Sequence, residues 1–234
     1  MEAIIIRLTS YKEKDYIVNA FTSEGQVTFR ASGALNVKSQ FAGKLFLYAL
    51  VDIELKETKA GFSLVSIKNL NYIAKIFTDY QKIITLNLIG EIMIRTLKDD
   101  DSISEAFPLL KNTLLGLPNT SKLLSLSYLF ITNLLRVIGL GFVIDRCVNC
   151  GVKDDIVGVS FYDGGLICKN CRNTDTMVLN EQQIKIIRYG FMINETQLFR
   201  HEFADEELKD ILKRFIVYLE ETYNFKIVSS ELIY

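Results

Sequence analysis

Short apolar runs alternate with polar turns over the first 76 residues, which is the pattern of consecutive β-strands. The turn Ser23-Glu24-Gly25 separates two of these runs and indicates a hairpin. Five short strands in about 75 residues suit a small barrel, so we predict an OB-fold, with an SH3-like barrel as the alternative. The strands are expected at residues 4–8, 17–22, 26–31, 45–55 and 62–67.

From Asp79 the apolar residues recur at helical spacing, so the remainder of the chain predicts helices. One helix extends to residue 97 and a short one follows Ser104, with Asp99-Asp100-Asp101 as a solvated turn between them. Two more helices end near residues 191 and 223, and Asn180 and Asp205 are their expected N-caps. The apolar face of the last helix is expected to contain Leu208, Ile211, Leu212, Phe215, Ile216 and Leu219.

Residues 122–140 form a long apolar segment that resembles a membrane span in length. Polar side chains interrupt it at Ser125, Ser127, Asn133 and Arg136. We therefore expect the buried central helix of a bundle and no membrane association.

Four cysteines occur as two tight pairs, Cys147 with Cys150 and Cys168 with Cys171, and residues 151–167 lie between the pairs. This spacing fits the pattern of a zinc ribbon, with a turn-forming Gly151 after the first pair. We predict one structural Zn²⁺ held by four thiolates, which leaves no open position for activating water. Two disulfides, a redox Cys-x-x-Cys or an iron–sulfur cluster are the alternatives.

The sequence therefore predicts an α+β protein with an N-terminal OB-fold β-barrel, followed by an α-helical domain into which a four-cysteine zinc ribbon is inserted. The expected nucleic-acid-binding domain covers residues 1–76 and the helical domain covers residues 77–234, with the ribbon at about 143–176.

The composition of the chain excludes several classes of protein. The chain is 49% hydrophobic and can bury a core, and its formal net charge of −1 excludes a uniformly basic coat protein. The chain has one histidine, His201, so catalysis that needs two imidazoles is excluded. His201 is interpreted as a surface residue. With no nucleotide-binding glycine pattern and no Ser–His–Asp set, we expect a binding protein and not an enzyme, although a carboxylate or cysteine enzyme is the competing hypothesis.

The N-terminus has no basic region or cleavage site, so we expect a cytoplasmic protein.

Charge is unevenly distributed along the chain. Residues 1–76 carry ten basic and seven acidic side chains, and residues 25–51 contain no Asp or Glu at all. Cations interleaved with aromatic rings are typical of a groove that binds a nucleic-acid backbone and stacks its bases. The candidate contacts are Arg30, Lys38, Phe41 and Lys44. Phe29 and Phe46 are expected to fill the barrel core, whereas stacking and burial remain equally open for Phe41.

Several segments, in their order, resemble the RecO family of bacterial recombination mediators. They are Tyr11-Lys12-Glu13-Lys14-Asp15, Phe21-Thr22-Ser23-Glu24-Gly25, the Gly- and Ser-containing loop 33–45, Gly139-Leu140-Gly141-Phe142 before the first cysteine pair, residues 164–171 around the second, and Phe225-Lys226-Ile227-Val228-Ser229-Ser230. The resemblance spans the whole chain. Of these segments, the cysteine motif is individually strong.

The resemblance implies a cytoplasmic, nucleoid-associated protein that binds single- and double-stranded DNA without catalysis. It also implies annealing of complementary strands and help in loading recombinase onto gaps coated by single-stranded DNA-binding protein. The implied protein partners are RecR and the C-terminal tail of single-stranded DNA-binding protein.

The sequence departs from the family's pattern in two places. Ala34-Leu35-Asn36 stand where Arg and Lys are usual, which implies weaker DNA affinity through this loop or affinity supplied by a partner. Val143 stands where Pro is frequent. An RNA- or ribosome-associated zinc-ribbon protein is the alternative reading, and a preference for RNA over DNA would support it.

Overall fold

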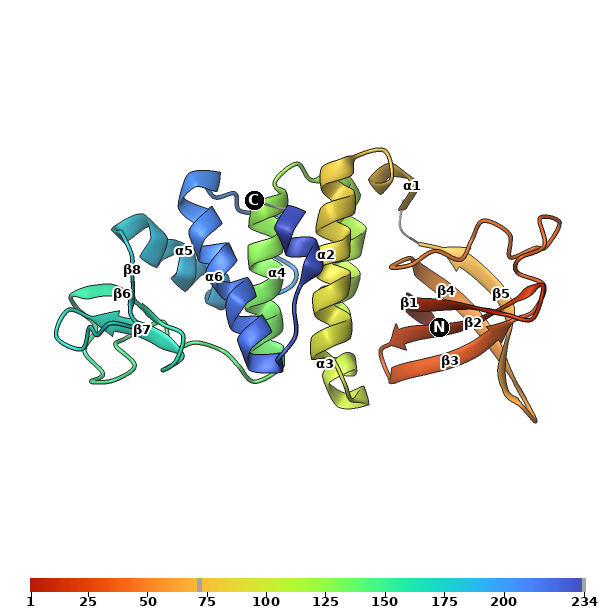
Figure 1. Ribbon diagram of the computed structural model, residues 1–234, viewed down its shortest axis with the longest axis horizontal. Helices are drawn as coiled ribbons and strands as arrows, with labels where there is room; N and C mark the ends of the chain where they lie inside the picture. The colour runs from red at the N-terminus through yellow and green to blue at the C-terminus, as the bar shows by residue number, and fades with distance from the viewer. Residues whose placement is uncertain (71–72, 233–234) are drawn as a thin grey trace. The chain divides into compact units, whose positions relative to one another are not determined.

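The computed structural model of the protein describes residues 1–70 and 73–232, which form two compact units, residues 1–120 and 121–234 (Figure 1). The helices between residues 73 and 119 therefore belong to the same unit as the N-terminal strands. The predicted division of the chain between residues 76 and 77 stays a prediction.

Five strands close into a barrel at the N-terminal end of the chain, which confirms the predicted small barrel of OB type (red and orange in Figure 1). The strand order is β1-β2-β3-β5-β4, and β1 pairs with β4 to close the ring. All pairs are antiparallel except β3 with β5. The strands are β1 (Glu2–Tyr11), β2 (Asp15–Thr22), β3 (Gly25–Ala31), β4 (Leu50–Thr58) and β5 (Gly61–Asn69).

The apolar side chains of alternating strand positions fill the barrel, and Phe29 is 1% exposed, as predicted. The prediction of a strand from residue 45 was wrong, because β4 begins at Leu50. Tyr48 has a φ of +62°, outside the β region, and its N–H bonds to the Ile5 carbonyl. Phe46 is half-buried, with its ring 6.2 Å from that of Phe77, and so is not in the barrel core.

Two long helices complete the first unit: α2 (Tyr80–Thr96) and α3 (Asp100–Gly116). The short helices α1 (Ile73–Ile76) and η1 (Leu117–Asn119) flank them. The three aspartates were predicted as a turn, but Asp99 is the N-cap of α3 and accepts from the Ser102 N–H, so the helix begins five residues earlier than expected. Helix α3 packs on the barrel, where the Asp100 carboxylate accepts from the Gln26 N–H at 2.7 Å.

The second unit is built around α4 (Leu123–Val137), which packs against α5 (Glu181–Met192) and α6 (Asp205–Tyr223). Its residues 125–135 are all buried, as predicted for a central helix. Within the described part of the chain, no helix is both long enough and apolar enough to span a bilayer. The turn η2 (Val228–Leu232) follows these helices.

One of the two predicted N-caps of these helices is confirmed. The Asn180 side chain accepts from the Gln183 N–H, and Gln183 reaches back to the Asn180 N–H. The predicted N-cap at Asp205 was wrong, because Ala204 is the N-cap of α6 and Asp205 is its first helical residue. All six residues of the predicted apolar face of α6 are buried.

Between α4 and α5 the chain forms a three-stranded antiparallel sheet, which we call the cysteine ribbon (residues 143–178). Its strands are β6 (Ile156–Ser160), β7 (Gly165–Cys168) and β8 (Met177–Val178), in the order β7-β6-β8. A cluster of aromatic rings packs the ribbon onto the helices, with neighbouring centroids 4.9–5.7 Å apart. We call these residues the aromatic cluster: Phe142, Phe161, Phe191, Phe215 and Tyr218.

Candidate metal centre and nucleic-acid interface

The cysteine ribbon brings all four cysteine sulfurs together, as the sequence spacing predicts. All four cysteines are free thiols, and their sulfur atoms lie within 4.8 Å of one another. The Cys150 and Cys168 sulfurs are 3.6 Å apart. Tetrahedral coordination by four thiolates at 2.3 Å places sulfurs about 3.8 Å apart, so the cluster has the dimensions of a four-coordinate metal site.

Two tight turns present these sulfurs. Gly151 has a φ of +77° and its N–H bonds back to the Cys147 carbonyl, a conformation that favours glycine. The second turn is closed by the Cys171 N–H donating to the Cys168 carbonyl at 3.1 Å. Gly165, in β7, lets this strand lie against the first turn, because a Cβ there would lie 2.9 Å from Cβ of Val148.

The thiols differ in acidity. Burial opposes ionisation of Cys147, but backbone N–H groups of Cys168, Cys150 and Asn149 donate to its sulfur and lower the pKa of this thiol to about 6. Hydrogen bonds with the side chains of Cys150 and Cys168 raise the pKa of the Cys171 thiol to about 12. Four negatively charged thiolates so close together repel one another. They therefore require a positive charge between them, which a divalent metal ion supplies.

On the barrel, Arg30 is paired with Asp15. Its Nε donates to the Asp15 carboxylate at 2.9 Å and its Nη2 forms an ion pair with the same oxygen. The other Asp15 oxygen accepts from the Gly33 N–H at 2.7 Å. The pKa of Asp15 is lowered, first by the Gly33 hydrogen bond and then by Arg30. The carboxylate thus fixes both the guanidinium and the start of the following loop.

The other candidate contacts lie on that loop, the β3–β4 loop (residues 32–49). Lys38 and Lys44 are exposed and available to a ligand. Phe41 is 6% exposed, so its ring is packed inside the loop and a stacking role would require it to leave this position. The loop is a series of tight turns closed by backbone hydrogen bonds, for example from Ser39 to Asn36 and from Ala42 to Ser39.

Sequence reasoning missed the residues at the β1–β2 turn. Tyr11 ends β1 with 42% of its surface exposed. The Lys12 ammonium and the Arg30 guanidinium each lie 5.4 Å from the centroid of its ring. In the sequence, Tyr11 and the alternating charges after it stood as a segment of the family resemblance. The available signal was an aromatic residue directly beside a lysine at a barrel end.

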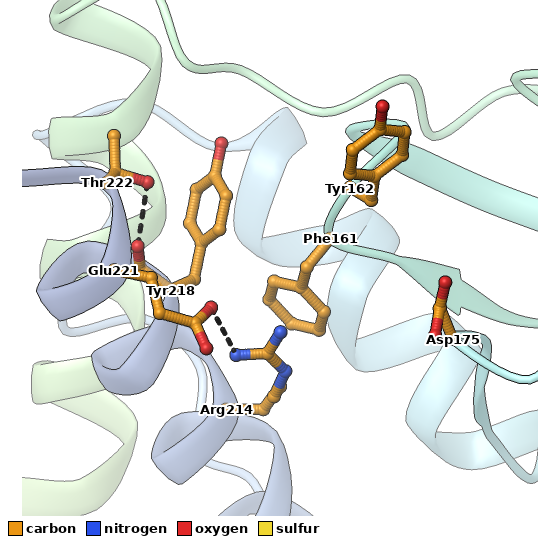
Figure 2. A pocket seen from close by; sticks show the side chains of 7 residues that line it. All are labelled: Phe161, Tyr162, Asp175, Arg214, Tyr218, Glu221 and Thr222. Atoms are coloured by element: carbon orange, nitrogen blue, oxygen red, sulfur yellow. Dashed lines mark hydrogen bonds and ion pairs between the residues drawn. The ribbon is translucent and has the colours of Figure 1, made fainter.

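An open hollow lies beside the ribbon, where it meets α6 (Figure 2). It has a volume of about 520 Å³. Figure 2 shows the Arg214 guanidinium beside the Phe161 ring, 4.6 Å from its centroid, and paired with Glu221 at 3.1 Å. Since Asp175 adds a second carboxylate, the hollow presents acidic and aromatic groups and does not suit the phosphates of a nucleic acid.

The remaining candidates from the sequence are surface groups. His201 is exposed, as predicted, and its ring lies 4.2 Å from that of Tyr189. Asp99, Asp100 and Asp101 are exposed at the start of α3, where they complement the helix dipole.

Comparison with known proteins gives matches over nearly the whole chain. Residues 1–76 match the family model described as "Recombination protein O N terminal", and residues 78–231 match "Recombination protein O C terminal". A protein named DNA repair protein RecO from Clostridium novyi (strain NT) is 22% identical, over 99% of this chain and 91% of the relative. Proteins of the same name from Thermoanaerobacter sp. (strain X514) and Geobacter sulfurreducens are 24% and 29% identical, over 99% and 73% of this chain and 95% and 71% of theirs.

Proposed function

This chain belongs to the recombination protein O family, and from that premise we propose that it is a DNA-binding recombination mediator of recombinational DNA repair that works without catalysis. We further propose that it binds single- and double-stranded DNA, anneals complementary strands and helps load recombinase onto gaps coated by single-stranded DNA-binding protein. RecR and the C-terminal tail of that binding protein are its proposed protein partners, and the bacterial nucleoid is its proposed location.

The observation that carries the DNA-binding proposal is the combination of an OB-type barrel with an acid-free sequence window. Small barrels of this type bind oligonucleotides on one face and through the loops at its ends. Exposed Lys38 and Lys44 lie on the β3–β4 loop, which falls within residues 25–51, where Asp and Glu do not occur. Arg30 has N–H groups beyond those that bond Asp15, so it is proposed as the third phosphate contact.

Binding of a labelled oligothymidylate and of a DNA duplex, followed by fluorescence anisotropy at several salt concentrations, tests this proposal. Three phosphate contacts predict a slope of log K against log salt of about −2 for the single strand, at roughly 0.7 per contact. Exchanging Lys38 and Lys44 for Gln should reduce the magnitude of the slope to about 0.7. Lys209→Gln, at an exposed position on α6, is the matched control and should leave the slope unchanged.

The same assay separates the two candidate polymers. An RNA strand of matched length that binds more tightly than DNA would favour the RNA-associated alternative, because the 2′-hydroxyl distinguishes the two. Annealing of complementary strands, and capture of purified RecR and single-stranded DNA-binding protein with and without DNA, test the finer parts of the proposal. A binding protein whose C-terminal tail has been removed is the control for that contact.

We propose Zn²⁺ as the occupant of the four-cysteine cluster, with Cys147, Cys150, Cys168 and Cys171 as its ligands. Four sulfurs at these distances suit a closed structural zinc site, in which the ion stabilises the ribbon and does no chemistry. Elemental analysis of purified protein should find one zinc ion per chain. Iron in its place, with the visible absorption of a sulfur cluster, would contradict the assignment.

A further inference from the structure

An exposed aromatic ring stands at the end of the barrel beside two cations. Tyr11 is paired with Asp15 across the β1–β2 turn, and its side chain is partly exposed. The Lys12 ammonium and the Arg30 guanidinium both lie within cation–π range of this ring, although they belong to different strands or turns. One partly exposed ring therefore has two positive charges over it, each close enough for a cation–π contact.

We propose that Tyr11 is a stacking site for one base of single-stranded nucleic acid, with Lys12 and Arg30 binding the adjoining phosphates. This inference rests on the proposed function and names a contact within it. Base–aromatic stacking combined with backbone-tracking cations is the general chemistry by which single strands are held. The bases of an intact duplex are already stacked on each other, so this contact distinguishes single strands from duplexes.

Asp15 acts in this site as a positioning residue. Its carboxylate occupies Nε and one N–H of Nη2 of Arg30, while the remaining N–H groups of the guanidinium stay available to a phosphate oxygen. The same carboxylate holds Gly33, and the Leu35 N–H bonds to the Lys14 carbonyl, so the β3–β4 loop is fastened to the β1–β2 turn. Residues far apart in the sequence are thus kept together around the ring.

The charges around Tyr11 favour an anion by a small margin. Lys12, Lys14 and Arg30 oppose Glu13 and Asp15, and Asp15 is already paired with Arg30. Affinity at this site is therefore expected to depend on the ring as well as on charge, which makes the two contributions separable by experiment.

The experiment uses the full chain and an oligothymidylate, together with an abasic strand of the same length. Tyr11→Ala should weaken binding of oligothymidylate roughly 5- to 150-fold, whereas Tyr11→Phe, which keeps the ring, should bind like the unaltered chain. With the abasic strand Tyr11→Ala should have no effect, because no base is present to stack. Lys12→Gln should weaken both strands alike.

A fluorescence readout reports the contact directly, because the chain contains no Trp. Tyr11→Trp places one indole at the site, and stacking of a base on it should quench its emission. Tyr162→Trp, at a tyrosine 92% exposed on the cysteine ribbon, is the matched control and should not be quenched.

The outcomes separate this inference from the function on which it rests. If the unaltered chain binds no oligonucleotide, the proposed function and the stacking site both fail. If it binds with a salt slope of about −2, or about −2.8 with Lys12 as a fourth phosphate contact, but Tyr11→Ala binds equally well, or loses affinity for the abasic strand too, the stacking site alone is overturned.

Discussion

The Asp15 carboxylate and the Arg30 guanidinium join the neighbouring strands β2 and β3, and the same carboxylate holds the first glycine of the β3–β4 loop. Asp15 is 7% exposed whereas the Arg30 side chain is 42% exposed, so the carboxylate is shielded while the guanidinium still reaches solvent. One side chain therefore anchors the loop that carries Lys38 and Lys44.

Asp15→Asn should loosen this anchor without unfolding the barrel. The amide keeps one acceptor oxygen but loses the charge that attracts Arg30 and the second acceptor that holds Gly33. Hydrogen exchange should become faster at the amides of Gly33 and Leu35 and stay unchanged in α6. Equal protection of the loop in both proteins would contradict the anchoring role.

The same pair predicts a dependence of stability on pH. The pKa of Asp15 is lowered in the folded protein, first by Gly33 and then by Arg30, so folding favours its ionised form. This contribution is fully present above the ordinary aspartate pKa of about 3.9 and is lost as the pH falls through the lower folded-state value. The difference in unfolding free energy between the unaltered chain and Asp15→Asn should therefore be smaller at acid pH than at pH 7.

Gly90→Ala should destabilise the first unit, although alanine is the better helix former by about 0.5–1 kcal/mol. A Cβ at this position in α2 would lie 2.2 Å from the Tyr48 ring, and overpacking of this kind costs about 1–3 kcal/mol. Urea unfolding of the single and double variants tests this. In a Tyr48→Ala background the clash is gone and Gly90→Ala should become stabilising. Stabilisation by Gly90→Ala in both backgrounds would show that the ring moves aside without cost.

Cys150→Ser should remove the metal ion and the structure of the ribbon, because three thiolates no longer close a structural site. Metal content and hydrogen exchange at the ribbon amides should change together, and a strong chelator should reproduce both effects in the unaltered chain. Asn149→Ala, at the exposed neighbour between the two ligands of the first turn, is the control and should retain the ion. A metal-free wild-type chain with a fully protected ribbon would refute the site.

Phe142→Ala should destabilise the second unit by about 3–5 kcal/mol, the usual cost of removing a buried aromatic ring. Phe142 is 7% exposed and contacts the four other rings of the aromatic cluster. Phe199→Ala, at a phenylalanine 41% exposed in the same unit, should cost within about 0.5 kcal/mol. Denaturant unfolding compares the two. Similar midpoints for both variants would show that the cluster does not stabilise the unit.

Local patterns in the sequence predicted the regular elements well. Alternation and helical periodicity are properties of short windows, so the barrel strands, the central helix α4 and the N-cap at Asn180 could be read directly. The cysteine spacing predicted a cluster for the same reason, since two turns and a short sheet are enough to gather four sulfurs.

Contacts between residues that are far apart in the sequence could not be predicted from these local patterns. Nothing local to Arg30 indicates that Asp15 pairs with it, and nothing local to Phe41 decides between burial and exposure. The start of α3 was missed although its N-cap contact, from the Ser102 N–H to Asp99, is local; the Gln26 N–H of the barrel, 74 positions from Asp100, adds a contact that the sequence does not indicate. Tyr11 was overlooked because the cation that completes its surroundings comes from β3.

One of the pairings in the barrel is very short. The parallel pairing of β3 with β5 consists of Phe29 with Phe62 and Arg30 with Ser63, whereas β4 and β5 share eight pairs. A closed sheet opens most readily where it has the fewest hydrogen bonds, and that seam here includes the arginine proposed to bind phosphate. A ligand that immobilises Arg30 also stabilises the pairing of β3 with β5. A more stable pairing in turn raises the affinity for that ligand by the same factor. The short β3–β5 pairing and the proposed phosphate contact therefore share one residue, Arg30.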